Sequence, residues 1–460
     1  MGYPSLRAWL THLNATGRVA VAKPNISLHH ELAAIAKKLD GKQATWFPSP
    51  SGHAIPVVSG LVSRRAWIAE AIGIPEAELL ARFRRAVEQP LPWREVERGA
   101  ASAQQVVVEA PDLRALLPIP THNEHDSGPY ITAGLLIARN PKTGIQNVSI
   151  NRVQVLDGRR LQALLLPRHL AAFHRMAETS NQPLDVAIVI GVDPLTLLAS
   201  QAITPIDHDE LEIAGSLAGT ALAVVKCIGS EVRVPAHAEI VIEGHLLAGV
   251  REQEGPFGEF PKYYSEKDAR EVIEVTRLTH RHNPIFHTIV PAEMEHLLLG
   301  AIPREASLLL HLQRSFPNVS DVHLAVGGVC RYHLYVQMKK TREGEPKNVI
   351  MGAFGGHYDI KQVIVVDDDV DVHNPTEVEW AVATRFQPDR DLVVVSGALG
   401  SALDPSTTDS ISGKWGLDAT RPLKYEGHTF TRVRIPGEDT LDLAQVIQAD
   451  AMINPELLKD

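Results

Sequence analysis

The sequence of 460 residues has only two cysteines, no long apolar run and no excess of basic side chains. Cys227 and Cys330 have no metal-ligand spacing, and so few cysteines fit a reducing cytoplasm. There is no run of about 18 apolar residues and no basic-then-apolar signal pattern, so we expect a cytoplasmic protein without a membrane segment. The net charge of -10 argues against a nucleic-acid or anionic-membrane partner, although local charge can still bind a small anionic substrate.

Several common catalytic and nucleotide-binding motifs are also missing. No P-loop, G-x-S-x-G elbow or H-E-x-x-H motif occurs, so standard hydrolase and zinc-protease chemistry has no support. Gly352-Ala-Phe-Gly-Gly356 lacks the G-x-G-x-x-G spacing of a dinucleotide site. Asp367-Asp-Asp369 and Asp371 follow an apolar strand; they could bind a divalent ion, but such acids more often cap a following helix or turn.

The chain is too long for one hydrophobic core, and its patterns divide it into parts. Residues 1–115 predict an N-terminal α/β domain, with helical spacing over 6–13 and 30–39 and a strand over 54–60. Residues 116–295 are rich in short β-branched runs, which predict a β-barrel or curved sheet. The runs are 131–137, 186–190, 221–225, 239–242 and 272–276.

Helix and strand patterns alternate again in the last part of the chain. Residues 296–439 predict a C-terminal α/β domain, so the whole is a mixed α+β protein. The uninterrupted apolar runs at 363–366 and 392–396 are typical of strands in a covered sheet. Residues 440–460 form the tail, where 441–447 predict a short amphipathic helix with no obvious intramolecular partner.

The most informative stretch is Glu254-Gly-Pro-Phe-Gly-Glu259. Glycine and proline so close together are poorly tolerated inside a helix, so we expect a loop. A loop can aim both carboxylates into one cavity, where like charges push their pKa values apart and leave one protonated near neutral pH. Such a pair would transfer protons; a surface turn with two solvated acids is the alternative.

A second group of polar residues lies upstream. Asn147, His169 and Glu210 offer an amide oxygen, an imidazole nitrogen and a carboxylate. This hard ligand set suits Mn²⁺ or Mg²⁺ that completes its shell with phosphate oxygens, rather than Zn²⁺ in a thiolate cage. Each residue by itself would more often be structural.

The order and spacing of five motifs resemble the UbiD-type decarboxylases over nearly the whole chain. The motifs are Asn-x4-Arg at 147–152, Pro-x-His at 167–169, Glu-x4-Gly at 210–215, Glu-Gly-Pro-Phe-Gly-Glu at 254–259 and Gly-Lys-Trp-Gly-Leu-Asp-Ala-Thr at 413–420. The resemblance implies reversible, non-oxidative decarboxylation of aromatic or α,β-unsaturated acids. It also implies prenylated FMN with its phosphate held through Mn²⁺ or Mg²⁺, K⁺ nearby, and a flavin prenyltransferase as cofactor supplier.

The same resemblance assigns a fold and residue roles. It implies a flavin-reductase-like split β-barrel as the central cofactor domain, and a homo-oligomer, a dimer or hexamer, built with the C-terminal helix. It implies Asn147, His169 and Glu210 as metal ligands and Arg152, Glu254 and Glu259 as the catalytic set. The cofactor would be bordered by Asn147, Val148, Ser149, Ile150, Asn151, Arg152, Arg168, His169, Glu210 and Lys414.

The chemistry of the residues agrees with these roles. Loss of CO₂ leaves a carbanion at an sp² carbon, which requires an electron sink such as a modified flavin. Arg152 can orient the substrate carboxylate, and Glu254 can pair with Arg152. Glu259 can protonate the carbon if burial and its carboxylate neighbour raise its pKa.

His296 and Arg304 help to predict the substrate. They are about two helical turns apart, although Pro303 interrupts the pattern and both could instead line a loop. Together they could bind a second carboxylate, and the pair resembles that of the furan-2,5-dicarboxylate decarboxylases within the family. This predicts conversion of furan-2,5-dicarboxylate to 2-furoate and CO₂. The alternative is that Arg304 pairs with Glu305 or Glu295 at the surface.

Two other functions stay open. One is a UbiD-type decarboxylase of another acid, of the pyrrole-2-carboxylate, phenylacrylate or hydroxybenzoate type. The other is a flavin-binding protein without catalysis, which the joint presence of Arg152, Glu254 and Glu259 argues against.

Overall fold

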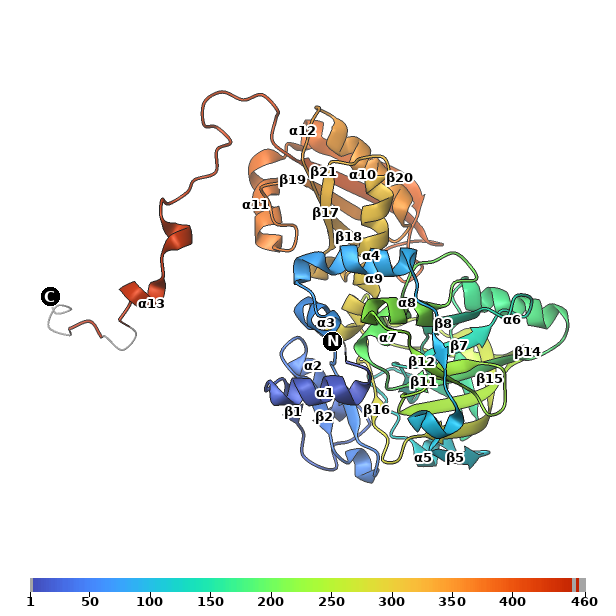
Figure 1. The fold of residues 1–460 in the computed structure, drawn as a ribbon. Coiled ribbons are helices and arrows are strands. Elements are labelled where there is room, and N and C mark those ends of the chain that lie inside the picture. Colours follow the sequence, from blue (N-terminus) through green and yellow to red (C-terminus); the bar gives the residue numbers. More distant parts are fainter. Residues whose placement is uncertain (1–2, 449–451, 455–460) are drawn as a thin grey trace.

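The first part of the chain holds a small sheet and several helices (Figure 1). The computed structural model describes residues 3–448 and 452–454. The four-stranded sheet has the order β1 (Val19–Val21), β2 (Ala44–Phe47), β3 (Val57–Ser59) and β16 (Phe286–His287). The helices are α1 (Leu6–Ala15), α2 (Glu31–Leu39), α3 (Arg65–Ile72) and α4 (Leu79–Glu88). The two helices and the strand predicted here are confirmed.

A nine-stranded, mainly antiparallel sheet curls into a half-barrel in the middle of the chain (Figure 1). Its strands are β5 (Val106–Glu109), β6 (Tyr130–Ile131), β7 (Leu135–Arg139), β8 (Gln146–Ile150), β9 (Val153–Val155), β10 (Arg160–Ala163), β11 (Leu184–Ile190), β14 (Ile240–Glu254) and β15 (Asp268–His280). An apolar cluster fills one side of this sheet. The prediction of a curved sheet is confirmed, but the run 131–137 is divided between β6 and β7.

Shorter elements cover the ends of the curled sheet. The helices are α5 (Leu113–Leu116), α6 (His169–Thr179), α7 (Pro194–Ala199) and α8 (Glu210–Ala218). A three-stranded sheet pairs β13 (Arg233–Pro235), β12 (Ala223–Lys226) and β4 (Arg94–Glu95). The side chain of Asp209 accepts the backbone N–H of Leu211 and so caps α8, which places Glu210 in the first helical turn.

The C-terminal part is a five-stranded mixed sheet with helices. The order is β17 (Val319–Leu324), β18 (His333–Met338), β19 (Gln362–Asp367), β21 (Ile411–Ala419) and β20 (Leu392–Leu399). The helices are α10 (Glu345–Gly356), α11 (Pro375–Arg385) and α12 (Pro388–Asp391). β19 is buried throughout, as predicted. The prediction of a covered strand at 392–396 is wrong, because β20 is an edge strand and Val394 is 64% exposed.

The long helix α9 (Met294–Gln313) connects the central and C-terminal parts (Figure 1). Pro303 lies inside this helix, so His296 and Arg304 belong to one continuous helix and not to a loop. Glu295 accepts hydrogen bonds from the backbone N–H groups of Gly60 and Leu61. A single apolar cluster runs from α1 past α9 to β19, so these parts pack on a shared core.

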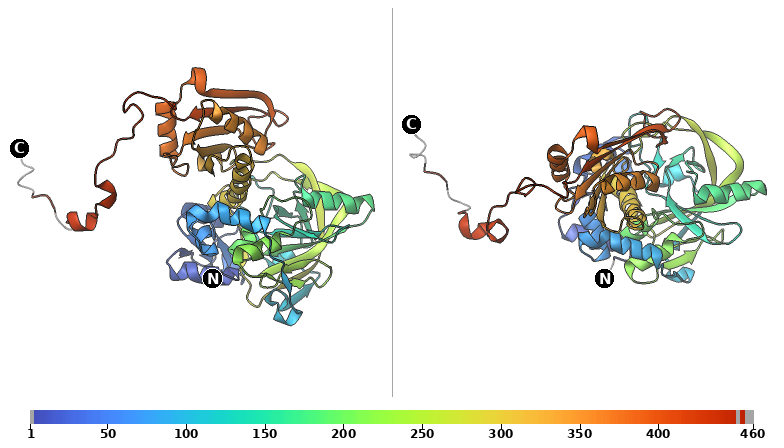
Figure 2. Two further views of the ribbon diagram at one scale, coloured as in Figure 1. Left: turned by 45° about the horizontal axis from the view of Figure 1, so that its top comes forward. Right: turned by 90° about the horizontal axis from the view of Figure 1, so that it is seen from above.

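The C-terminal segment leaves the folded body (Figure 2). It contains α13 (Leu443–Val446), which is shorter than the predicted helix at 441–447. The predicted C-terminal tail, residues 440–460, also includes 449–451 and 455–460, which lie outside the described residues. No described helix has the length and apolar character needed to cross a lipid bilayer.

Candidate active site

Two carboxylates share one arginine at the end of the longest strand. β14 ends at Glu254, and the following loop carries Glu259. Arg152 lies just beyond β8 and donates through Nη2 to Oε2 of Glu254 at 2.8 Å. Its Nη1 donates to Oε1 of Glu259. The structure therefore brings together the three residues that sequence reasoning grouped as a catalytic set.

Both carboxylates are buried. Glu254 is 1% exposed and Glu259 is 8% exposed, so the alternative of a solvated surface turn is wrong. Burial raises the pKa of Glu259, while the positive charge of Arg152 and its hydrogen bond partly oppose this rise. A carboxyl group in these surroundings can carry a proton to a reacting atom.

Tyr130, on β6, contacts this set and was missed by sequence reasoning. Its hydroxyl lies 3.0 Å from Oε1 of Glu254. Its ring packs against Phe257, with centroids 4.4 Å apart, and the guanidinium of Arg152 lies over the same Phe257 ring. No sequence signal marks Tyr130, because tyrosine is common in strands and its contacts come from a distant loop.

The loop is held in place from outside by residues 123–126. The backbone N–H of Gly258 donates to Asp126 Oδ1 at 2.8 Å. A Cβ at Gly258 would lie 2.4 Å from Nδ2 of Asn123, so glycine is required for this close approach.

A cavity of about 380 Å³ lies beside β8 and the start of α6. It is lined by Asn147, Val148, Ser149, Ile150, Asn151, Leu165, Leu166, Pro167, Arg168, His169, Leu170, Ser200, Gln201, Ala202, Ile203, Thr204 and Glu210. Of the residues expected to border the cofactor, only Arg152 and Lys414 are outside this lining. Eight of the 17 residues that line this cavity are therefore ones that the family resemblance assigned to the cofactor.

The three expected metal ligands meet in this cavity. Glu210 is buried, accepts the backbone N–H of Val148 at 2.7 Å and, among the described residues, forms no ion pair. Burial, together with the charge of Arg168, lowers the pKa of His169, so its imidazole is neutral at pH 7 and has a lone pair for a metal. Nitrogen and oxygen donors beside an uncompensated carboxylate fit a divalent cation.

Arg304 is half-buried, with 11% of its side chain exposed, and does not pair with Glu305 or Glu295 at the surface. Its Nε donates to Nε2 of His357 at 3.3 Å, and its Nη1 donates to the carbonyl oxygen of Gly300 at 3.1 Å. The carboxylate of Asp359 lies 3.7 Å from Nη2. Burial, with the nearby charge of Arg331, lowers the pKa of Arg304 to about 9.

Arg331 is a second cation in this region; it is buried, and sequence reasoning missed it. Its Nη1 donates to the carbonyl oxygens of Leu297 and Cys330, and no described carboxylate forms an ion pair with it. A Cβ at residue 300 would lie 1.6 Å from Nη2 of Arg331, so Gly300 makes room for the guanidinium. The guanidinium also lies 5.3 Å from the ring centroid of Phe260, next to Glu259.

The other two predicted residues lie around these cations. His296 is half-buried; burial, with the charge of Arg331, lowers its pKa to about 3. Lys414 is buried on β21 and donates to the carbonyl oxygens of Tyr358 and Ile360. Arg168, in the cavity wall, is close enough to lower the pKa of Arg304, so the cavity and the cation cluster are neighbours.

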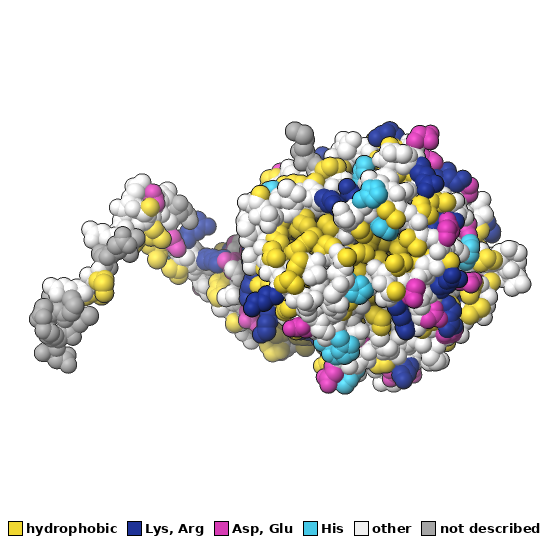
Figure 3. Space-filling view, turned by 90° about the horizontal axis from the view of Figure 1, so that it is seen from below, with side chains coloured by type: hydrophobic (Ala, Val, Ile, Leu, Met, Phe, Trp, Pro, Cys, Tyr) yellow, Lys and Arg dark blue, Asp and Glu magenta, His cyan; other side chains and the backbone are white. Residues whose placement is uncertain are grey.

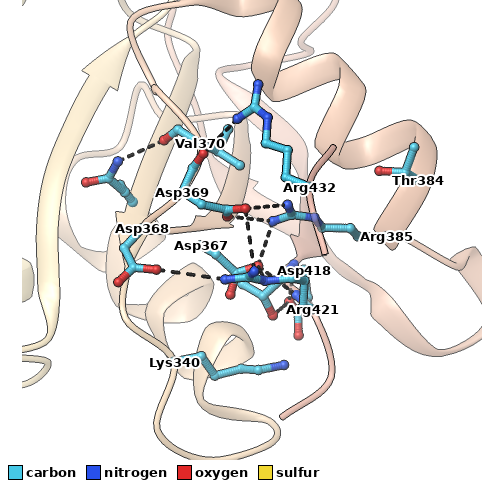
Figure 4. Close-up of polar contacts among 12 residues, drawn as sticks. Lys340, Asp367, Asp368, Asp369, Val370, Thr384, Arg385, Asp418, Arg421 and Arg432 are labelled. Carbon is cyan, nitrogen blue, oxygen red and sulfur yellow. Dashed lines mark hydrogen bonds and ion pairs between the residues drawn. The ribbon is translucent and has the colours of Figure 1, made fainter. Parts of the chain in front are cut away.

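The acids after β19 are neutralised by arginines (Figure 4). Arg385 donates to Asp367 at 2.7 Å and to Asp369 at 2.9 Å, and the backbone N–H of Arg421 donates to Asp367. No described group of three or more His, Cys, Asp or Glu residues is arranged to hold a metal ion. These aspartates therefore link elements of the C-terminal sheet.

A larger cavity, of about 560 Å³, lies on the other side of β8. Gln146 and Asp209 line it, whereas their neighbours Asn147 and Glu210 face the smaller cavity. None of the predicted site residues lies in its wall.

Three family models match most of the chain. They describe the N-terminal, Rift-related and C-terminal domains of 3-octaprenyl-4-hydroxybenzoate carboxy-lyase, UbiD, and match residues 10–87, 94–294 and 297–419. A protein from Methanothermobacter thermautotrophicus, described as anhydromevalonate phosphate decarboxylase, is 42% identical over 382 residues. That match covers 82% of this chain and 88% of the relative.

Solved structures agree with the family models. The UbiD-class enzyme HmfF from Pelotomaculum thermopropionicum, in complex with FMN, has a TM-score of 0.95 and 48% identity, covering 96% of this chain and 100% of that chain. An evolved dimeric form of HmfF with prFMN has a TM-score of 0.90 and 46% identity over the same shares. The chain therefore belongs to the UbiD family: it is a UbiD-type decarboxylase with the mixed α/β fold and curled half-barrel sheet of these carboxy-lyases.

Proposed function

We propose that this decarboxylase uses prenylated FMN to remove one carboxylate from furan-2,5-dicarboxylate, which yields 2-furoate and CO₂. The proposal goes beyond the family assignment in two respects: it names the cofactor, and it gives the substrate a second anionic group. The excess of positive charge at the buried Arg331 and the half-buried Arg304 is the observation that carries it.

The smaller cavity supports the cofactor. The HmfF structures contain FMN and prFMN, and the cavity beside β8 offers backbone, Arg168 and the Asn147, His169 and Glu210 donor set for a phosphate and its cation. We assign Mn²⁺ or Mg²⁺ to these three residues, with K⁺ nearby. The modified flavin would supply the electron sink for the carbanion.

His169 tests the metal assignment. His169→Ala removes a ligand, so protein made with a flavin prenyltransferase should lose both Mn²⁺ and flavin, measured by metal analysis and absorption spectroscopy. The control is His208→Ala, because this neighbouring histidine does not line the smaller cavity. A full complement of both in His169→Ala would refute the ligand role.

The protein's own groups divide the remaining work. Arg152 faces the reacting carboxylate, and it can exchange its bond to Glu259 for a substrate oxygen because protonated Glu259 no longer competes as an anion. When the C–C bond breaks, CO₂ leaves and Glu259 gives its proton to the ring carbon. One proton from solvent then restores Glu259, so charge and atoms balance.

The cation cluster fits the second carboxylate. Arg304, Arg331 and the lone carboxylate of Asp359 leave an excess of positive charge in a buried region. A bound anion would offset the desolvation of these guanidinium groups. Arg331 contacts Phe260, directly after Glu259, so the cluster adjoins the catalytic loop.

Arg304→Ala tests this assignment. It should lower kcat/KM for furan-2,5-dicarboxylate far more than for pyrrole-2-carboxylate, because only the dicarboxylate has a second anionic group. Truncating one partner of a buried, hydrogen-bonded charge pair costs about 2 to 5 kcal/mol. Arg314→Ala, on the exposed end of α9, is the matched control. An equal loss for both acids would mean that Arg304 supports the fold or the cofactor.

A phosphorylated acid is the second candidate. Several relatives, of which one is 42% identical, are described as anhydromevalonate phosphate decarboxylases. A phosphate would also be bound by two arginines. Measuring CO₂ release from furan-2,5-dicarboxylate and from an unsaturated acid with a terminal phosphate decides between the two, and turnover of only the latter would replace the furan assignment.

A further inference from the structure

We propose that Tyr130 is a positioning residue, which holds Glu254 and, through it, Arg152 in the geometry that decarboxylation requires. The inference rests on the proposed roles of Arg152, Glu254 and Glu259. It concerns a side chain outside the cavity wall and outside the motifs of the sequence.

The hydroxyl of Tyr130 has three polar neighbours. It lies 2.9 Å from Ser127 Oγ, 3.0 Å from Glu254 Oε1 and 3.3 Å from Gln154 Oε1. A phenol has a single proton to donate, and a carboxylate is a stronger acceptor than an amide oxygen. Tyr130 therefore donates to Glu254, while Ser127 can donate to the phenol oxygen. The residue is 0% exposed, so water does not compete for this bond.

Both oxygens of Glu254 are engaged as a result. Oε1 accepts from Tyr130, and Oε2 accepts from Arg152 at 2.8 Å. Arg270 adds a second cation, 3.9 Å from Oε2. A carboxylate held from opposite sides cannot rotate freely, so the direction of its bond to Arg152 is fixed.

The ring of Tyr130 supports Arg152 by a second route. Phe257 packs against Tyr130, and the guanidinium carbon of Arg152 lies 5.1 Å from the centroid of the Phe257 ring. One residue thus supports the carboxylate partner and the aromatic partner of the same arginine. Arg152 must turn one face toward the substrate, so these supports limit where the reacting carboxylate can bind.

Tyr130→Phe separates the hydroxyl from the ring. The variant keeps the packing against Phe257 and loses only the bond to Glu254. We expect kcat/KM to fall about 10- to 100-fold, the equivalent of one hydrogen bond to a charged group, with flavin content unchanged. Tyr264→Phe is the matched control. The hydroxyl of this exposed tyrosine accepts a weak bond from the backbone N–H of His125, so the activity of the variant should equal that of wild type.

A double-mutant cycle distinguishes positioning from a general effect on the fold. In the Glu254→Gln background, Tyr130→Phe should cost less than about threefold, since its charged acceptor is already gone. Equal losses in the two backgrounds would overturn the proposal. Crystal structures of the wild-type and Tyr130→Phe holoproteins give a readout that needs no substrate. In Tyr130→Phe, the carboxylate of Glu254 should turn away from Arg152. An unchanged Glu254–Arg152 pair would also overturn it, whereas failure of the furan assignment would leave this readout intact.

Discussion

Glu254 and Glu259 share Arg152, yet their partners differ. Glu254 accepts hydrogen bonds from both Arg152 and Tyr130, which hold its carboxylate on two sides. Among the described residues, Glu259 has Arg152 as its one side-chain partner, and burial raises its pKa. The two carboxylates therefore suit different tasks, one as a fixed hydrogen-bond acceptor and the other as a proton carrier.

Glu259→Gln should abolish most turnover and retain flavin and substrate binding. An amide cannot deliver the proton, and loss of a general acid typically costs about 10²- to 10⁴-fold. In wild type, the protonated fraction of Glu259 falls as pH rises through its raised pKa, so kcat should decline on the alkaline side of that pKa. Steady-state kinetics across pH measure both effects.

Glu266→Gln, in the same loop but exposed, is the control for this prediction. Turnover of Glu259→Gln close to that of wild type would exclude Glu259 as the proton donor.

At the scale of elements, α9 joins the parts that form the site. Glu305 on α9 is fully buried and accepts from Arg65 of α3, at 2.5 Å, and from the backbone N–H of Leu324 on β17. His323 lies 3.0 Å from the same carboxylate. Burial raises the pKa of Glu305, but Arg65 and His323 outweigh it, and the net pKa falls to about 2.

Glu305→Gln should lower the free energy of unfolding by about 3 to 5 kcal/mol at pH 7, because Arg65, whose side chain is 11% exposed, would lose its close partner and keep the longer ion pair with Glu76 at 3.7 Å. In wild type, the folded-state pKa is below the unfolded value, so this stabilisation is present above about pH 4.5 and is lost as pH falls toward 2. Urea unfolding at several pH values measures both.

Glu88→Gln removes an exposed pair with Arg84 on α4 and should cost less than about 1 kcal/mol. If Glu305→Gln were no more costly than this control, α9 would not depend on Glu305 for its position.

At the scale of the whole molecule, apolar surface is left without cover. The tail exposes Leu441, Leu443, Val446 and Ile447, and β20 exposes Val394. Arg432 ties the base of the tail to Glu377 and packs over Trp380, but the residues after it leave the body (Figure 2). Apolar side chains also gather at the centre of the face seen from below (Figure 3). Such surfaces indicate association with further subunits.

We predict that the protein is a homo-oligomer, either a dimer or a hexamer, in which the tail of one subunit binds a neighbouring subunit. Removing residues from Thr440 onward should give monomers or aggregates, because the exposed apolar groups lose their partner. Light scattering measures the mass. Leu443→Asp with Val446→Asp keeps the chain length and should have the same effect; native mass in both variants would contradict the role of the tail.

Sequence patterns predicted much of the architecture, and the family resemblance named part of one wall of the site. Helical spacing identified α1 and α2, because side-chain periodicity follows from helix geometry, and uninterrupted apolar runs rich in β-branched residues identified β11 and β19. The same reasoning failed for β20, since an apolar run does not reveal whether another layer covers the strand. The cavity residues 147–151, Arg168 and His169 were named because they lie in short motifs that resemble the family's, each continuous in the chain.

The tertiary structure decided which distant residues act together. Tyr130 reaches Glu254 across 124 positions of sequence, and Arg304 meets His357 across 53. Arg331 lies against Gly300 only because α9 passes the turn after β17. Contacts of this kind depend on how the sheet curls and on where α9 crosses, and these are properties of the packed molecule that no local pattern contains.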